Sequence, residues 1–184
     1  MSRLLYLSIL LTTSLLTSAL QAKPISVPPI DKLLNKFNLP AFTQLVFVDS
    51  SLNKSCQRYE PKTRLCGKGN EMAVQKISDA TKMAKPGYLF LIRQGSYNQA
   101  LHVVQSGNAK AYIGFSSYQN EKVQIQGVNS IDQGQEYGAI WLDQASYILI
   151  NGLTVTDSIG FGRFLNAHHN IFSNNNFTGS TIYN

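Results

Sequence analysis

The chain has 184 residues and a formal net charge of +6, and 43% of its residues are hydrophobic. This length suits one ordinary domain with a packed core. The basic residues are concentrated between positions 54 and 93, and no nucleic-acid-binding motif accompanies them, so we expect no nucleic acid as a partner. The charge suits an acidic polysaccharide or an anionic cell surface, and a merely solvated basic face is the alternative.

The first 22 residues have the layout of a secretory signal. Arg3 precedes an apolar run from Leu4 to Leu20, and Ala19 and Ala22 are candidate cleavage positions. We therefore expect a signal peptide over residues 1–22 and a protein that is secreted, periplasmic or on the cell surface, with no membrane anchor after cleavage. An uncleaved anchor helix is the alternative. No second apolar stretch is long enough to span a bilayer.

A proline-rich leader over residues 23–40 follows, with a short helix expected over residues 31–37. We expect residues 41–87 to form a strand over residues 43–49, a disulfide loop and an amphipathic helix over residues 71–84. Cys56 and Cys66 are the only cysteines, and in an exported chain such a pair favours a disulfide. A zinc site is the alternative, but no pair of histidines lies near them.

Beyond Gly87 the charges become sparse, and short apolar runs recur between Gly, Asn and Ser. The segment that begins at Val123 matches the one at Ile148 with an offset of 25. The segment at Ile150 matches the one at Phe172 with an offset of 22, and an offset of 23 is nearly as good. A period in the low twenties with short strands is typical of a β-solenoid. The runs are residues 88–92, 101–104, 122–127, 139–142, 147–155 and 170–177.

The fold class that we predict is all-β, a right-handed parallel β-helix with an N-terminal capping helix. An antiparallel sandwich is the alternative, but tight two-residue hairpin signals between the runs are scarce. We expect residues 88–184 to be the first coils of this β-helix. Because a solenoid usually ends in an atypical repeat, we also expect the chain to be truncated or to be completed by a partner.

The run from Ile77 to Gly87, followed by Leu89 to Tyr97, resembles the entry segment of pectate-lyase-like right-handed β-helix proteins. In that superfamily a capping helix ends in Pro-Gly, a first strand follows, and a Gly-x-Tyr turn opens the coils. Residues 141–156 resemble a later coil. The nearest sub-group is the chondroitinase B and alginate lyase type of polysaccharide lyase, and the resemblance covers residues 47–177. It implies cleavage of an acidic glycan by β-elimination.

The same resemblance implies a basic group that removes a proton next to a uronic carboxylate, and an arginine or a calcium ion that neutralises the acid. Arg163 is the leading catalytic candidate, and His168 and His169 are the others. Asp143 and Asp157 are candidate ligands of the cation. None of these residues forms a motif that matches the family's catalytic positions.

Each candidate also has a purely structural interpretation. His168 and His169 precede a strand and suit a corner, Asp157 suits a turn, and Arg163 suits the end of a stack. His102 lies within an apolar run, so we expect it to be buried and hydrogen-bonded.

Two functions remain open at this point. The first is an exported polysaccharide lyase that acts on acidic glycans, for which this chain alone is expected to lack the full active site. The second is a non-catalytic surface or glycan-binding β-helix protein, or an inactive fragment.

Overall fold

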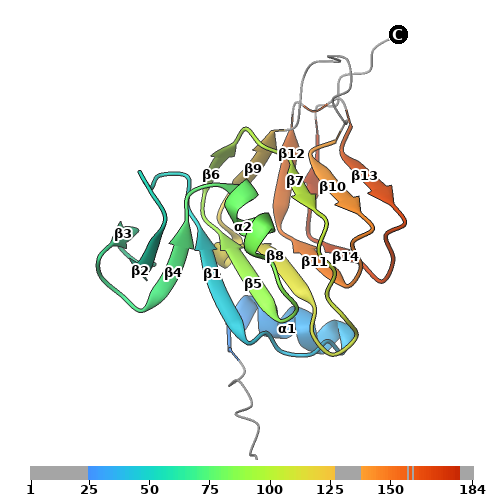
Figure 1. Cartoon of the computed structure of the whole chain (residues 1–184), viewed down its shortest axis with the longest axis horizontal. Coiled ribbons are helices and arrows are strands. Elements are labelled where there is room, and N and C mark those ends of the chain that lie inside the picture. Colours follow the sequence, from blue (N-terminus) through green and yellow to red (C-terminus); the bar gives the residue numbers. More distant parts are fainter. Residues whose placement is uncertain (1–24, 127–137, 157, 159, 179–184) are drawn as a thin grey trace, which may run out of the picture.

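The computed structural model describes residues 25–126, 138–156, 158 and 160–178. The described chain is mostly β, and its strands form three sheets, here called A, B and C (Figure 1). Sheet A has the strand order β14-β11-β8-β5-β1-β4-β2-β3, sheet B the order β15-β12-β9-β6, and sheet C the order β13-β10-β7. All pairings are parallel except those that β2 makes with β3 and β4.

The elements have the following bounds: α1 Pro28–Phe37, β1 Gln44–Val48, β2 Cys56–Glu60, β3 Leu65–Cys66, β4 Glu71–Val74, α2 Ile77–Met83, β5 Tyr88–Ile92, β6 Gly95–Tyr97, β7 Leu101–Val103, β8 Ile113–Ser117, the 3-10 helix η1 Tyr118–Asn120, β9 Val123–Gln126, β10 Ile140–Asp143, β11 Ile148–Asn151, β12 Leu153–Thr156, β13 Gly162–Leu165, β14 Ile171–Ser173 and β15 Asn176–Phe177.

From β5 onward, consecutive strands enter the sheets in the fixed order A, B, C, and we call each such set a circuit. β5, β6 and β7 form one circuit, β8 to β10 and β11 to β13 form the next two, and β14 and β15 begin another. Each strand pairs in parallel with the strand of the same sheet in the neighbouring circuit. Matching side chains of successive circuits therefore stack above one another.

A column of inward side chains in sheet A forms the centre of the core. Val46, Phe90, Phe115, Ile150 and Phe172 occupy matching register positions on five strands. The rings of Phe90 and Phe115 are stacked with centroids 5.0 Å apart. The first four members are buried, whereas Phe172 at the end of the column is 38% exposed. Neighbouring strands therefore shield the first four side chains from solvent, whereas Phe172, on the last strand of the sheet, is partly open to it.

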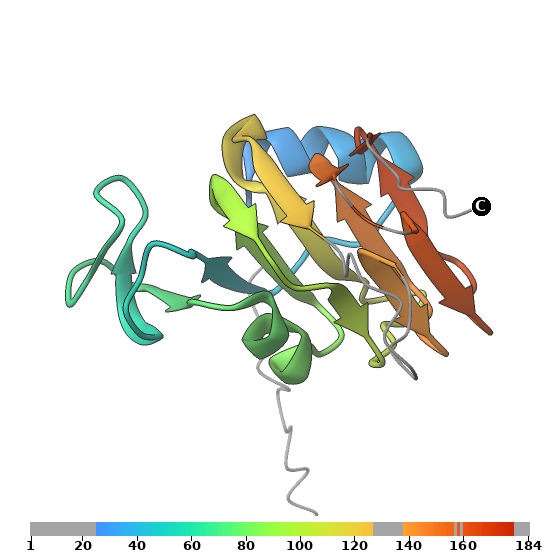
Figure 2. The same ribbon diagram turned by 90° about the horizontal axis from the view of Figure 1, so that it is seen from above.

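Helix α1 covers the outer face of sheet A (Figure 2). Pro28 and Pro29 stand in its first turn, where a missing backbone N–H costs nothing. Ile30, Leu33 and Leu34 are buried and pack into a cluster with sheet residues that include Leu89 and Leu149. Sheet A is therefore apolar on both faces. This is why its strands read as continuous hydrophobic runs rather than as alternating patterns.

The helix predicted over residues 71–84 is shorter in the structure. Its first part is strand β4, where Met72, Ala73 and Val74 pair in parallel with β1, and α2 begins only at Ile77. Pairing with an existing apolar strand outweighs the helix propensity of this segment. Helix α2 then packs against β7, β1 and β4, where Ile77 and Ala80 join the core.

The disulfide loop forms a lobe at the end of sheet A, which we call the disulfide lobe (residues 54–70; Figure 2). The predicted bond between Cys56 and Cys66 is confirmed. It joins β2 and β3, which pair antiparallel, and β2 in turn pairs with β4. The lobe thus extends the sheet beyond β4 by two short strands.

The repeat offset of 22 is found in the structure, whereas the offset of 25 is wrong as a register. Ile150 pairs with Phe172, as the sequence match indicated. Val123, however, pairs with Gly95 and Leu153 in sheet B, whereas Ile148 lies in sheet A. The two similar segments occupy different sheets, since both place apolar residues at every second position before a corner.

Other strand predictions also differ from the structure. The Gly-x-Tyr turn, which falls on residues 95–97, is strand β6 in the structure, and β8 and β13 were not predicted as strands. Within the described residues, no helix is long and apolar enough to cross a membrane. The predicted signal peptide, residues 1–22, lies outside the described residues.

We expect Phe115→Ala to lower the free energy of unfolding by about 3–5 kcal/mol, because it removes a fully buried ring from the middle of the column. Phe172→Ala is the matched control from the same column, and it should cost about 1 kcal/mol or less because that ring is already partly exposed. Urea denaturation of the two variants checks this. Equal losses would contradict the assignment of the column as the centre of the core.

Candidate functional site

The outer face of sheet C carries a column of three side chains from three different strands. His102 on β7 lies opposite Trp141 on β10, and Trp141 lies opposite Arg163 on β13. The neighbours Leu101, Val103, Ile140 and Leu142 are buried in the core, so the alternation of the strands turns these three side chains outward. We call them the His–Trp–Arg column.

The members of the column are in direct contact. The rings of His102 and Trp141 are parallel within 5°, with centroids 3.6 Å apart. The guanidinium carbon of Arg163 lies 5.4 Å from the centre of the Trp141 ring, within the range of a cation–π contact. The indole is thus covered on one face by an imidazole and approached on the other by a cation. A ligand on this face would meet the ring edges and the charged end of Arg163.

Two ring nitrogens of the column have no hydrogen-bond partner among the described residues. They are Nε2 of His102 and Nε1 of Trp141. The prediction for His102 therefore needs correction, because its ring is only half-buried and its shielded nitrogen is unpaired. Unpaired buried polar atoms are uncommon in folded proteins, and they point to a place where a water molecule or a ligand completes the structure.

A pocket of about 220 Å³ adjoins the column between α2 and β7. Lys82 and Gln105 both line it, and Oε1 of Gln105 is buried with no hydrogen-bond partner in the described part of the chain. The volume lies below the roughly 300–1,000 Å³ of drug-sized sites, so the pocket would hold one unit of a larger ligand. Its lining residues are Ser78, Thr81, Lys82, Ala100, His102, Val104 and Gln105.

His168 and His169 belong to a different column. They lie in the turn between β13 and β14, where the His169 ring stacks on Tyr147 with centroids 4.8 Å apart. Tyr147 in turn contacts Tyr112 edge-on. The Nδ1 atoms of the two histidines lie 2.7 Å apart. This geometry fits the structural interpretation of the pair as a corner, and it separates both histidines from the column that holds Arg163.

The two candidate cation ligands have different outcomes. Asp143 is the last residue of β10, two positions beyond Trp141, and is therefore on the same outer face of sheet C. Asp157 lies outside the described residues. Among the residues that the structure describes, no group of three His, Cys, Asp or Glu side chains could hold a metal ion.

Sequence reasoning missed a network of buried charges just beyond the carboxyl ends of β1 and β5 in sheet A. Arg93 is 5% exposed and binds the Glu121 carboxylate through two hydrogen bonds of 2.9 and 2.8 Å. It also donates to the Tyr59 hydroxyl at 2.8 Å, which donates to Asp49 at 2.6 Å. Arg64 of the disulfide lobe binds both oxygens of Asp49. The network ties the lobe to the ends of β1 and β5.

The network also changes the acidity of its members. Burial alone would raise the pKa of Asp49, but hydrogen bonds from Arg64, Tyr59 and Ser51 outweigh it and hold that pKa well below its usual range. At Glu121, burial would likewise raise the pKa, but hydrogen bonds from Arg93 and the backbone N–H of Gln94 lower it below its usual value. Both carboxylates are therefore fixed in the charged form, which suits a structural clamp rather than proton transfer.

We expect the protein to lose stability below about pH 4. The pKa values of Asp49 and Glu121 are lower in the folded state than in the unfolded chain, where carboxyl groups titrate near pH 4. Their contribution is therefore complete above that pH and is lost as the pH falls toward the folded values. Urea midpoints at pH 7 and pH 3 measure the loss.

Asp49→Asn should reduce this pH dependence and also lower the stability at pH 7. Phe172→Ala, which removes no titratable group, should keep the full dependence and serves as the control. A pH dependence in Asp49→Asn as steep as that of the unsubstituted protein would contradict the role of the network.

Comparisons with known proteins provide one relative and no fold assignment. The chain is 32% identical over 87 residues to the uncharacterized protein YwoF of Bacillus subtilis (strain 168). The match covers 47% of this chain and 19% of that protein, so the shared segment spans about a fifth of the relative. No family model and no solved structure matches the chain.

Proposed function

We propose that the protein is an exported, carbohydrate-active β-helix protein that binds acidic polysaccharides on the outer face of sheet C. In this proposal the circuits of strands are coils of a right-handed parallel β-helix, and α2 is the helix that covers its first coil. The order A, B, C of the parallel strands supports the fold. The observation that carries the function is the His–Trp–Arg column beside the pocket that Lys82 and Gln105 line.

The chemistry of this face matches an acidic glycan. Arg163 and Lys82 provide cations near its two ends, and a guanidinium binds a carboxylate through paired hydrogen bonds. Aromatic edges and polar side chains lie between them, which suits the mixed apolar and hydroxylated surface of a sugar ring. Because the column runs across several strands, a polymer rather than a single sugar would use its whole length.

The resemblance to polysaccharide lyases makes the proposal more specific. In β-elimination a base removes the proton next to the uronic carboxyl group, the electron pair forms a carbon–carbon double bond, and the glycosidic oxygen leaves with a proton. Arg163 would pair with the carboxylate and stabilise the negative charge that develops there. Asp143 lies on the same face, but the described residues offer no group of three ligands for a cation, so the proposal assigns the neutralising charge to Arg163.

A second candidate, a glycan-binding protein without catalysis, is favoured by one detail of the column. The Trp141 ring lies between Arg163 and His102, which stand two strands apart in sheet C. Adjacent strands are about 4.8 Å apart, so the titratable ring of His102 is about 10 Å from the strand that carries Arg163. This spacing suits contacts with neighbouring sugar units rather than a base and a cation at one carbon atom.

The single tryptophan of the chain, Trp141, makes the binding measurable by fluorescence. We expect oligosaccharides of pectate, alginate or chondroitin sulfate to change its emission. Arg163→Gln should weaken this binding about tenfold, because hydrogen bonds to charged groups contribute roughly 1.5–3 kcal/mol. Lys62→Gln, in the exposed part of the disulfide lobe, is the control and should bind normally.

Absorbance of unsaturated products, followed with and without calcium, separates the two candidates. Product formation supports the lyase, and binding without product supports the glycan-binding protein. Unchanged affinity in Arg163→Gln, or equal binding of a neutral glycan, would contradict the assignment of this face as the acidic-glycan site.

A further inference from the structure

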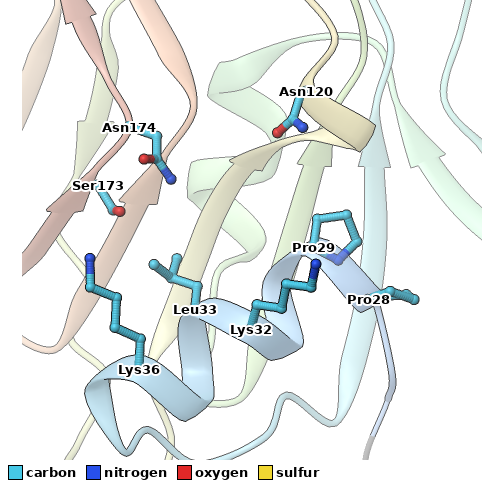
Figure 3. Close-up of a pocket in the computed structure, with 8 residues that line it drawn as sticks. All are labelled: Pro28, Pro29, Lys32, Leu33, Lys36, Asn120, Ser173 and Asn174. Atoms are coloured by element: carbon cyan, nitrogen blue, oxygen red, sulfur yellow. The ribbon is translucent and has the colours of Figure 1, made fainter.

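A larger cavity, of about 440 Å³, lies between α1 and the corners of sheet A (Figure 3). Its volume falls within the roughly 300–1,000 Å³ that is usual for small-molecule sites. Helix α1 supplies one wall and the ends of η1 and β14 supply the other. The lining residues are Pro28, Pro29, Lys32, Leu33, Lys36, Asn120, Ser173 and Asn174.

Both walls of this α1 cavity are held in place by the fold. The buried side chains of Ile30, Leu33 and Leu34 anchor α1 to sheet A. On the opposite wall, the amide of Asn174 donates to Oδ1 of Asn151 at 3.0 Å, and Asn151 donates to Ser116 at 2.9 Å. A ligand would therefore meet a preformed site and would not have to order it, which favours affinity.

The charges of the cavity are positive. Lys32 and Lys36 are four residues apart, so they lie on the same side of α1, and both line the cavity (Figure 3). Neither is in an ion pair with any residue that the structure describes. The nearest acid in the sequence, Asp31, accepts hydrogen bonds from the Ser26 hydroxyl at 2.6 Å and the Val27 N–H at 3.2 Å, so its charge is already engaged.

The uncharged lining suits a sugar. Asn120, Asn174 and Ser173 offer donors and acceptors for hydroxyl groups, whereas Pro28, Pro29 and Leu33 offer an apolar surface for the C–H face of a pyranose ring. A phosphate or sulfate ion alone would use the lysines but not this apolar surface. The combination of two cations, amides and an apolar floor is the chemistry that a carboxylated sugar requires.

We propose that the α1 cavity is a second binding site, which holds a uronic acid unit with its carboxylate between Lys32 and Lys36. The identity of the ligand rests on the proposed function, because both sites would then bind the same class of acidic polysaccharide. The site itself is separate from the His–Trp–Arg column, since it is built from α1 and the corners of sheet A. A polymer held at two places would gain affinity through its length.

Binding of a tetrasaccharide of galacturonic acid to the 184-residue chain tests this site, with maltotetraose as the uncharged probe. NMR follows the side-chain amides of Asn120 and Asn174 for the cavity and the indole N–H of Trp141 for the column. We expect the acidic probe to shift the signals of Asn120 and Asn174, and we expect maltotetraose to leave them unchanged. Lys32→Gln with Lys36→Gln should weaken this response about tenfold or more.

Two controls accompany the double substitution. Lys62→Gln with Lys68→Gln removes the same charge from the disulfide lobe and should leave the cavity response intact. Lys32→Arg with Lys36→Arg keeps the charge and should restore binding. Lysine and glutamine have similar helix propensities, and a thermal unfolding curve verifies that α1 remains folded.

The outcomes distinguish this site from the proposed function. Loss of the Asn120 and Asn174 response in the lysine variant, with the Trp141 response retained, supports the second site. An unchanged response in that variant, an equal response to maltotetraose, or full competition by inorganic phosphate at equal concentration would overturn it. If instead only the Trp141 response is missing in all variants, the α1 site stands and the proposed role of sheet C fails.

Discussion

The stacking of like side chains at matching register positions is the interaction on which the structure depends. Phe90 lies on Phe115, and Phe115 lies on Ile150, only because each strand pairs with its counterpart one circuit away. Burial of these side chains stabilises the sheets, and the sheets in turn fix which residues can be buried. The outward residues inherit the same order. The His–Trp–Arg column is therefore a consequence of core packing as much as of the residues that compose it.

Much of this arrangement could be predicted from local sequence. The strand at Tyr88–Ile92 has the bounds that its apolar run indicated, and the match between Ile150 and Phe172 gave the register of the last two circuits. Prediction failed where local pattern and tertiary pairing disagree. Residues 71–76 have helical spacing, but β4 forms there because β1 offers an apolar partner. Strand β13 was not predicted because its short Gly-Arg-Phe-Leu run begins with a glycine, lies two residues after another, and has no clear alternation.

The candidate site illustrates the same limit. Arg163 was recognised as a candidate, and Trp141 lies 22 residues before it, at the same offset that relates Ile150 to Phe172. His102 lies 39 residues before Trp141, so the repeat offset does not place it in the column. The buried network around Asp49 was also missed. Asp49 and Arg93 both follow parallel strands that end at the same edge, so the register of β1 and β5 would have placed them together. From sequence alone, a charged residue in a short loop is expected to be solvated, because its buried partners come from other parts of the chain.

Equivalent positions of successive circuits are separated by different lengths of chain, and this affects how such a protein can change during evolution. At one corner, Asn151 bonds to Ser116 across 35 residues of chain and to Asn174 across 23 residues. The corner forms with either length of intervening chain, because the side-chain hydrogen bonds set its geometry and the number of residues between the bonded positions does not. Insertions can therefore accumulate in the loops, which reshape the outer surface, while the hydrophobic interior keeps its register. The outer surface and the folded core are in this way open to separate selection.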